Sequence, residues 1–381
     1  MNASLNEKIQ NVKWGKYKLE DLFESSNGNY DIQRKHINGV GDYVVTSGLT
    51  NNGIMGKSDV TAKVFKRGTI TVDMFGLVFY RNFDYKMVTH ARVFSLKPKI
   101  SISDSQGLFI ASAFSYIKNS FGFDNMCTWD KIKDLYIQLP TVNNHIDFHF
   151  IDSFVAELKV ERIARLSAYL KARGLDNYEL SDVDLQAIHE FESLTCNDWS
   201  EFKIGELFDR VKTIKLPYKA DDLPKQPTGN YTLPCLTSSF QNQGLNYYAP
   251  IENATVLRNV ISIPSNSDVY RAYYQPKDFT VLSDAYAIRW KKDDVIKITP
   301  EQYIFMVMCI NKVTDLPIYS YKNKLGGWNI VKEKYIQLPV KNGVINFDLM
   351  GKYIIALKKL AIKEVAVYTE KEEQALLSVS D

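Results

Sequence analysis

Few side chains in this sequence have both the type and the spacing that catalytic chemistry requires. Gly56-Lys57-Ser58 has the ending of a phosphate-binding loop, but Asn51 stands where the first glycine belongs, and strands rather than a helix are predicted to follow. His145 and His149 lie four residues apart, a spacing that two metal ligands on a helix would have, but no third ligand is evident near them. The Pro-Pro motif of amino-methyltransferases does not occur. The sequence therefore predicts no catalytic centre and no metal site in this chain.

Polar side chains gather instead in the turns between predicted strands. Donors and acceptors on loops can read base edges, while Lys, Arg and small polar groups contact phosphates, so such turns are candidates for binding nucleic acid. In the first half of the chain the candidates are Ser25, Asn27, Ser47, Thr50, Asn51, Asn52, Lys57, Arg81 and Lys86. In the second half they are Lys212, Lys215, Ser238, Ser239, Gln241, Asn242, Arg271, Lys322 and Lys324. For each residue the alternative interpretation is an ordinary solvated turn.

The composition is that of a soluble globular protein with two ordinary domains. The 381 residues are 45% hydrophobic and 24% charged, and an aromatic content of 13% favours strands and binding surfaces. A net charge of +3 is weak for a protein that clamps nucleic acid alone, so a basic surface must be local or supplied by a partner. The four cysteines have no paired spacing, which indicates a reducing compartment. No signal peptide or apolar run long enough to cross a membrane is evident, so we expect a cytoplasmic protein with no membrane partner.

The two halves of the chain repeat one another. The segment Trp14–Phe23 matches Trp199–Phe208, at an offset of 185 residues. The pentapeptide Tyr-Ile-Gln-Leu-Pro occurs at Tyr136–Pro140 and again at Tyr335–Pro339, at an offset of 199 residues. The ends of the repeat are therefore similar, whereas the middle of the second copy carries net insertions. Internal repeats of this kind indicate two copies of one folded module.

Each copy has the pattern of a strand-rich globule followed by one long helix. Short alternating or β-branched runs predict strands at 68–72, 76–80, 91–96, 260–263 and 285–290, and helices are expected at 106–118 and 300–310. Stretches without Gly or Pro follow each globule, and their apolar residues recur every three or four positions, as in helices that pair. The resulting segments are a globule at 12–149, a helix at 150–174, a linker with a short helix at 175–198, a globule at 199–347, a helix at 348–372 and a frayed tail at 373–381.

The order of globule, helix, globule and helix resembles the DNA specificity subunits of type I restriction-modification systems, including the similar type IIB subunits that resemble BcgI. The resemblance rests on the Trp14–Phe23 and Trp199–Phe208 segments, the two Ile-Gln-Leu-Pro closers and the helix after each, and it covers nearly the whole chain. It implies an α+β chain with two tandem target recognition domains, each followed by a long helix, the two helices pairing antiparallel as a spacer.

The resemblance also implies a function and partners. Each domain would read one half of a split site in double-stranded DNA, and the helices would dock DNA adenine methyltransferase subunits and, in some systems, a nuclease or translocase. The chain itself would be non-catalytic and bind no cofactor, with S-adenosylmethionine and Mg on the partner subunits. A spacer of roughly 35 Å would separate the half-sites by about one turn of B-DNA.

Two other functions stay open at this point. The chain could be an enzyme acting on DNA or another polymer through an unfamiliar site, in which case the purified protein alone should show turnover. It could also be a tandem adaptor that binds proteins or glycans through its aromatic-rich globules, an interpretation that the near-neutral charge allows. A gel shift with randomised duplex separates these possibilities.

Overall fold

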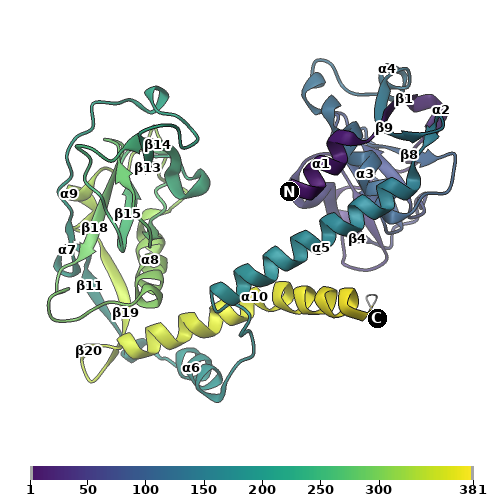
Figure 1. Cartoon of the computed structure of the whole chain (residues 1–381). Coiled ribbons are helices and arrows are strands. Elements are labelled where there is room, and N and C mark those ends of the chain that lie inside the picture. The colour runs from purple at the N-terminus through teal and green to yellow at the C-terminus, as the bar shows by residue number, and fades with distance from the viewer. Residues whose placement is uncertain (1–2, 379–381) are drawn as a thin grey trace. The chain divides into compact units, whose positions relative to one another are not determined.

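A computed structural model of the chain describes residues 3–378 and contains two compact units. The first unit comprises the residues up to Tyr169 and those from Thr369 on, and the second comprises Leu170–Tyr368. Each unit carries one copy of the repeat, which we call module 1 (Trp14–Ile146) and module 2 (Trp199–Ile345). Figure 1 shows each module as strands and short helices.

Module 1 is preceded by α1 (Ala3–Asn11) and contains ten strands. Its elements are β1 (Trp14–Lys18), α2 (Leu19–Leu22), β2 (Phe23–Asn27), η1 (Arg34–His36), β3 (Asp42–Val45), η2 (Thr50–Gly53), β4 (Ile54–Ser58), β5 (Thr69–Val72), β6 (Val78–Arg81), β7 (Tyr85–Met87), β8 (Phe94–Pro98), α3 (Asp104–Phe114), η3 (Ser115–Ser120), α4 (Trp129–Ile132), β9 (Tyr136–Val142) and β10 (His145–Ile146).

Module 2 repeats this order closely. Its elements are η4 (Cys196–Asp198), β11 (Trp199–Lys203), α7 (Ile204–Leu207), β12 (Phe208–Arg210), η5 (Ala220–Asp222), β13 (Tyr231–Leu236), η6 (Gln241–Gly244), β14 (Leu245–Pro250), β15 (Val260–Pro264), β16 (Tyr273–Gln275), β17 (Thr280–Val281), β18 (Ala285–Trp290), α8 (Pro300–Thr314), α9 (Trp328–Val331), β19 (Tyr335–Lys341) and β20 (Val344–Ile345). The expected strand-rich globules are confirmed.

Both modules build the same three sheets. The orders are β1-β9-β10, β2-β8-β5-β6 and β4-β3-β7 in module 1, and β11-β19-β20, β12-β18-β15-β16 and β14-β13-β17 in module 2. In the last sheet of each module one pair is parallel, β3 with β7 and β13 with β17. This parallel pairing brings the end of β3 beside the residues that follow β7, and the end of β13 beside those that follow β17.

The repeated Trp and Pro of the sequence are partners in a strand pair. Trp14 lies opposite Pro140 in the antiparallel pair of β1 and β9, and Trp199 lies opposite Pro339 in the pair of β11 and β19. The pentapeptide alternates as an antiparallel strand should, with Ile and Leu buried and Tyr and Gln exposed in both copies. The matching ends of the repeat therefore close each module.

One helix packs on the core of each module. Both helices begin with a capping box, Ser103 with Gln106 at α3 and Thr299 with Gln302 at α8. The buried face of α8 includes Met306 and Ile310, which join the largest core cluster of module 2. The prediction of a helix in each module before its closing strand is confirmed, although α3 ends at Phe114 and continues as the 3-10 segment η3.

The long helices are α5 (Phe148–Ala172) and α10 (Phe347–Ser378), and the linker helix is α6 (Asp182–Glu192). Helix α10 continues past the expected end at 372, so residues 373–378 are helical, while the rest of the predicted frayed tail lies outside the described residues. The last residues of α5 belong to the second unit, and the last residues of α10 belong to the first unit. Within the first unit, Lys159 Nζ of α5 lies 2.5 Å from Glu372 Oε2 of α10. No helix within residues 3–378 is long and apolar enough to cross a membrane.

Candidate nucleic-acid interface

The two modules share an unusual loop, which joins β3 to β4 in module 1 and β13 to β14 in module 2. Asn51, Asn52 and Gly53 have φ angles of 48°, 50° and 73°, and the equivalent Asn242, Gln243 and Gly244 have φ angles of 47°, 55° and 85°. Three consecutive residues in the left-handed region are costly for side chains other than glycine and asparagine. Such a backbone persists only where its surroundings enforce it, which makes these loops candidates for function.

A close backbone contact explains the glycine in each loop. The amide of Thr46 donates to Gly53 O at 2.7 Å, and that of Thr237 donates to Gly244 O at 3.0 Å. A Cβ on Gly53 would lie 2.6 Å from Thr46 O, and one on Gly244 would lie 2.9 Å from Thr237 O. Only glycine fits at these positions.

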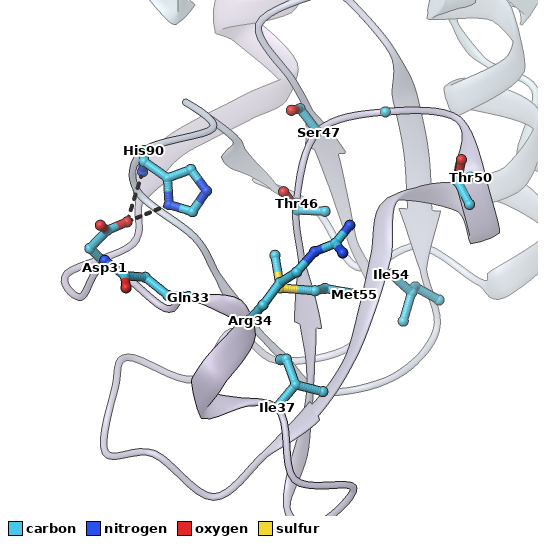
Figure 2. A pocket seen from close by; sticks show the side chains of 11 residues that line it. Asp31, Gln33, Arg34, Ile37, Thr46, Ser47, Thr50, Ile54, Met55 and His90 are labelled. Atoms are coloured by element: carbon cyan, nitrogen blue, oxygen red, sulfur yellow. Dashed lines mark hydrogen bonds and ion pairs between the residues drawn. The ribbon is translucent and has the colours of Figure 1, made fainter. Parts of the chain in front are cut away.

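A groove of about 950 Å³ lies beside the loop of module 1 (Figure 2). It is lined by Asp31, Gln33, Arg34, Ile37, Thr46, Ser47, Gly48, Thr50, Ile54, Met55 and His90. Asp31 Oδ1 accepts from His90 Nδ1 at 2.5 Å, and this hydrogen bond holds the pKa of Asp31 below its ordinary value. In Figure 2 the side chain of Arg34 projects from its turn into the space that these residues surround.

A groove of about 650 Å³ occupies the same place in module 2. It is lined by Ala220, Lys225, Gln226, Thr237, Ser238, Ser239, Gln241, Asn242, Leu245, Asn246, Tyr247, Tyr248 and Asp284. The positions correspond, because Val88 donates to Val45 O and Leu282 donates to Leu236 O, which makes His90 equivalent to Asp284. The two grooves therefore share a backbone frame, while their side chains differ.

Buried polar side chains support the loops from below. In module 2, Gln275 Nε2 donates to Ser262 Oγ at 3.0 Å and reaches Gln243 O, on the left-handed loop, at 3.5 Å. Strand pairing makes Arg81 the equivalent of Gln275 in module 1, where Arg81 Nε donates to Thr71 Oγ1 at 2.9 Å. A Cβ on Gly53 would lie 3.6 Å from the Arg81 guanidinium, which places this cation under the loop. Burial lowers the pKa of Arg81 to about 10.

A buried carboxylate fixes the other side of the module 1 loop. Asp73, which is 3% exposed, accepts from the Gly48 amide through Oδ2 at 2.9 Å. Its Oδ1 accepts from the amides of Phe75 and Leu77, both at 2.9 Å. Module 2 has Pro264 at the equivalent position, so only module 1 uses a charge here.

Two of the predicted DNA-contacting residues are buried in the structure. Arg81 and Lys86 are only 2% and 5% exposed, so neither presents its charge at the surface. Lys86 Nζ donates to Ser58 O at 3.0 Å and lies 3.4 Å from Asp42 Oδ2. Both residues lie on short strands whose side chains partly face the interior of the module. Because Arg and Lys are charged, their burial was not evident from the sequence.

The structure gathers some of the other predicted residues and separates the rest. Groove residues among them are Ser47, Thr50, Ser238, Ser239, Gln241 and Asn242, and Asn51 and Asn52 lie exposed on the loop itself. Outside the two groove linings lie Ser25, Asn27, Lys57, Lys212, Lys215, Arg271, Lys322 and Lys324. Arg271 is committed to an ion pair with Asp315 at 2.6 Å.

Several groove residues were not predicted from the sequence. They include Gln33, Arg34 and His90 in module 1 and Lys225 and Gln226 in module 2. The run Arg34-Lys35-His36 was the available signal, because three consecutive basic residues suggest a contact with an anion or a base edge. Among residues 3–378 no group of three or more His, Cys, Asp or Glu is placed to hold a metal ion.

Comparisons with known proteins agree with this duplicated architecture. A family model described as the type I restriction modification DNA specificity domain matches residues 11–168. The whole chain is 22% identical over 365 residues to the specificity subunit of the type II restriction enzyme BcgI from Heyndrickxia coagulans, covering 95% of this chain and 98% of that one.

A solved structure extends the likeness to the fold. The S subunit of a type I restriction-modification system from M. genitalium is 15% identical and has a TM-score of 0.52, over 97% of this chain and 94% of the other. The resemblance to restriction-modification specificity subunits, expected from the sequence, is thus confirmed, and so is the α+β fold with two strand-rich domains and a long helix after each.

Proposed function

We propose that this specificity subunit reads a bipartite site in double-stranded DNA, with one half-site for each module. The observation that carries the proposal is the pair of grooves, which lie at equivalent positions beside the same left-handed loop but have different linings. A shared frame gives both modules the same way of approaching DNA. Different side chains on that frame give each module its own sequence preference.

We further propose that α5 and α10 pair antiparallel as a spacer and dock DNA adenine methyltransferase subunits. Ile355, Leu360 and Tyr368 of α10 are 42%, 45% and 50% exposed, so these apolar side chains are available to a partner. The chain then has no catalytic role and acts in the cytoplasm. S-adenosylmethionine and Mg bind to the methyltransferase and to any nuclease or translocase subunit, rather than to this chain.

The test is selection from a duplex library with a randomised centre, by the full-length chain alone and together with an adenine methyltransferase subunit of a restriction-modification system. We expect two short, unrelated motifs separated by a fixed number of unread base pairs. A double substitution in the groove of module 2, Ser238→Ala with Gln241→Ala, should alter one motif and leave the other unchanged. One continuous motif would contradict the split site, and turnover by the chain alone would contradict the non-catalytic role.

A further inference from the structure

Arg34 is the one groove residue of module 1 that carries a positive charge at every ordinary pH and has that charge available. Its side chain is exposed, and within the described residues no hydrogen bond or ion pair joins its guanidinium to another group. The nearby carboxylate of Asp31 accepts through Oδ1 from the ring and the amide of His90 and from Thr89, and in the described part of the chain no ion pair joins it to Arg34. The guanidinium of Arg34 is therefore available to a ligand in the groove.

The turn that carries Arg34 is fixed from both sides. Gln33 and His36 form a capping box around η1, in which the Gln33 amide donates to His36 Nδ1 at 3.1 Å. The buried Ser58, at the end of β4, donates through Oγ to His36 O at 2.6 Å. A guanidinium presented by an anchored turn loses less freedom on binding than one on a mobile loop.

The other groove residues favour a base edge over a phosphate. The hydroxyls of Ser47 and Thr50 can donate or accept, and the apolar side chains of Ile37, Ile54 and Met55 suit a thymine methyl group. A phosphate site would gather several cations, whereas Arg34 is accompanied here by an acidic residue paired with His90. An arginine fork matches the two acceptors O6 and N7 that guanine presents in the major groove.

Module 2 has no arginine at its groove. The residues there with amide side chains are Gln226, Gln241, Asn242 and Asn246, and the one cation is Lys225. Amide side chains match the donor and acceptor of adenine rather than the two acceptors of guanine. The two grooves thus differ in the base chemistry that they offer.

We propose that Arg34 determines specificity in module 1 by reading a guanine of its half-site, and that the half-site of module 2 is read through amides without an arginine–guanine contact. This inference rests on the proposed function, because it names the base that one groove recognises. It assigns to Arg34 a role that Lys35, its exposed neighbour on the same turn, does not share.

The experiment compares Arg34→Ala, Arg34→Lys and the control Lys35→Ala with the wild type, using the full-length chain and the duplex selected above. Single-base variants of that duplex are titrated at two salt concentrations. For Arg34→Ala we expect the preference for guanine at one position of one half-site to fall about 10- to 100-fold. The other half-site and the Lys35→Ala protein should keep their preferences. Thermal melting should be unchanged, because Arg34 is exposed and makes no contact that stabilises the fold.

The outcomes separate this inference from the proposed function. A wild-type protein that selects no DNA sequence overturns both. Selection of two half-sites with the guanine preference intact in Arg34→Ala overturns the inference alone. A uniform loss of affinity for all sequences, with a shallower salt dependence, identifies a phosphate contact and also overturns it. Arg34→Lys should keep part of the preference, because an ammonium can donate to guanine without the bidentate fork.

Discussion

Asp73→Asn should release the groove loop of module 1 while leaving that of module 2 in place. The substitution keeps the shape of the side chain, and its remaining oxygen can still accept from the amides of Phe75 and Leu77. The new amide nitrogen, however, faces the Gly48 N–H, which now donates to Asp73 Oδ2 at 2.9 Å. Two donors then point at each other, and the Gly48 amide loses its partner.

The magnitude follows from the charge of the acceptor and its burial. A hydrogen bond to a charged group contributes about 1.5–3 kcal/mol, more than one between neutral groups. Asp73 is 3% exposed, so water cannot easily replace the lost contact. Loss of the carboxylate also removes a negative charge that helps to keep the buried Arg81 protonated. We therefore expect the local opening of the loop to become about 2 kcal/mol easier, or roughly 30-fold more populated.

Amide hydrogen exchange measures this opening directly. In Asp73→Asn the peptide that contains Gly48 should exchange about 30-fold faster than in the wild type. The peptide that spans Thr237–Gly244 in module 2 is the internal control, because Pro264 stands at the position equivalent to Asp73. Affinity for the half-site of module 1 should fall in the same variant. Unchanged exchange at Gly48 would show that the loop is held by other contacts and would refute the reasoning.

Two further predictions concern buried charges in the two units. Asp184 accepts from Lys359 Nζ at 2.7 Å and from Ser181 at the start of α6. Asp184→Ala should therefore lower the free energy of unfolding of the second unit, measured in urea, by about 2–4 kcal/mol. The control Asp182→Ala, at an exposed position of the same helix, should not lower it. Burial would raise the pKa of Asp184, but the hydrogen bonds from Lys359 and Ser181 outweigh this effect, so the pKa is lowered. The stabilisation by Asp184 is therefore fully present above the ordinary carboxyl pKa of about 4 and is lost as the pH falls further. Urea titrations at pH values from 3 to 7 would detect this loss. Lys86→Met should lower the melting temperature, because Ser58 O loses its hydrogen-bond donor. The affinity for DNA, measured by fluorescence anisotropy, should stay within about twofold of the wild type. A tenfold loss of affinity at an unchanged melting temperature would show that Lys86 contacts DNA.

The sequence contained enough local information to predict the modules and their ends. The identity of Tyr136–Pro140 and Tyr335–Pro339 reflects one strand pair used twice, and the alternation within each pentapeptide gives its buried face. Capping residues such as Thr299 and Gln302 mark helix starts because their hydrogen bonds join neighbours in the chain. Patterns of this kind are local, so they can be read without the fold.

The burial of single polar residues could not be read in this way. Arg81 ends β6 in one sheet and Lys86 lies on β7 in another, although only a few residues separate them. Neither strand is long enough to show a clear period, since β6 has four residues and β7 has three. Which side chains face inward was therefore decided by the packing of the two sheets.

Local patterns in the sequence are thus enough to identify two copies of one strand-rich module, each followed by a long helix, because matching motifs and periodic apolar residues are properties of neighbouring positions. The position of a ligand groove depends on the fold instead. Arg34, Thr50 and His90 are far apart in the chain and meet at one groove because β3 pairs in parallel with β7, which requires a long connection between the two strands. A contact of this kind depends on how strands cross over, and no local pattern of residues encodes it.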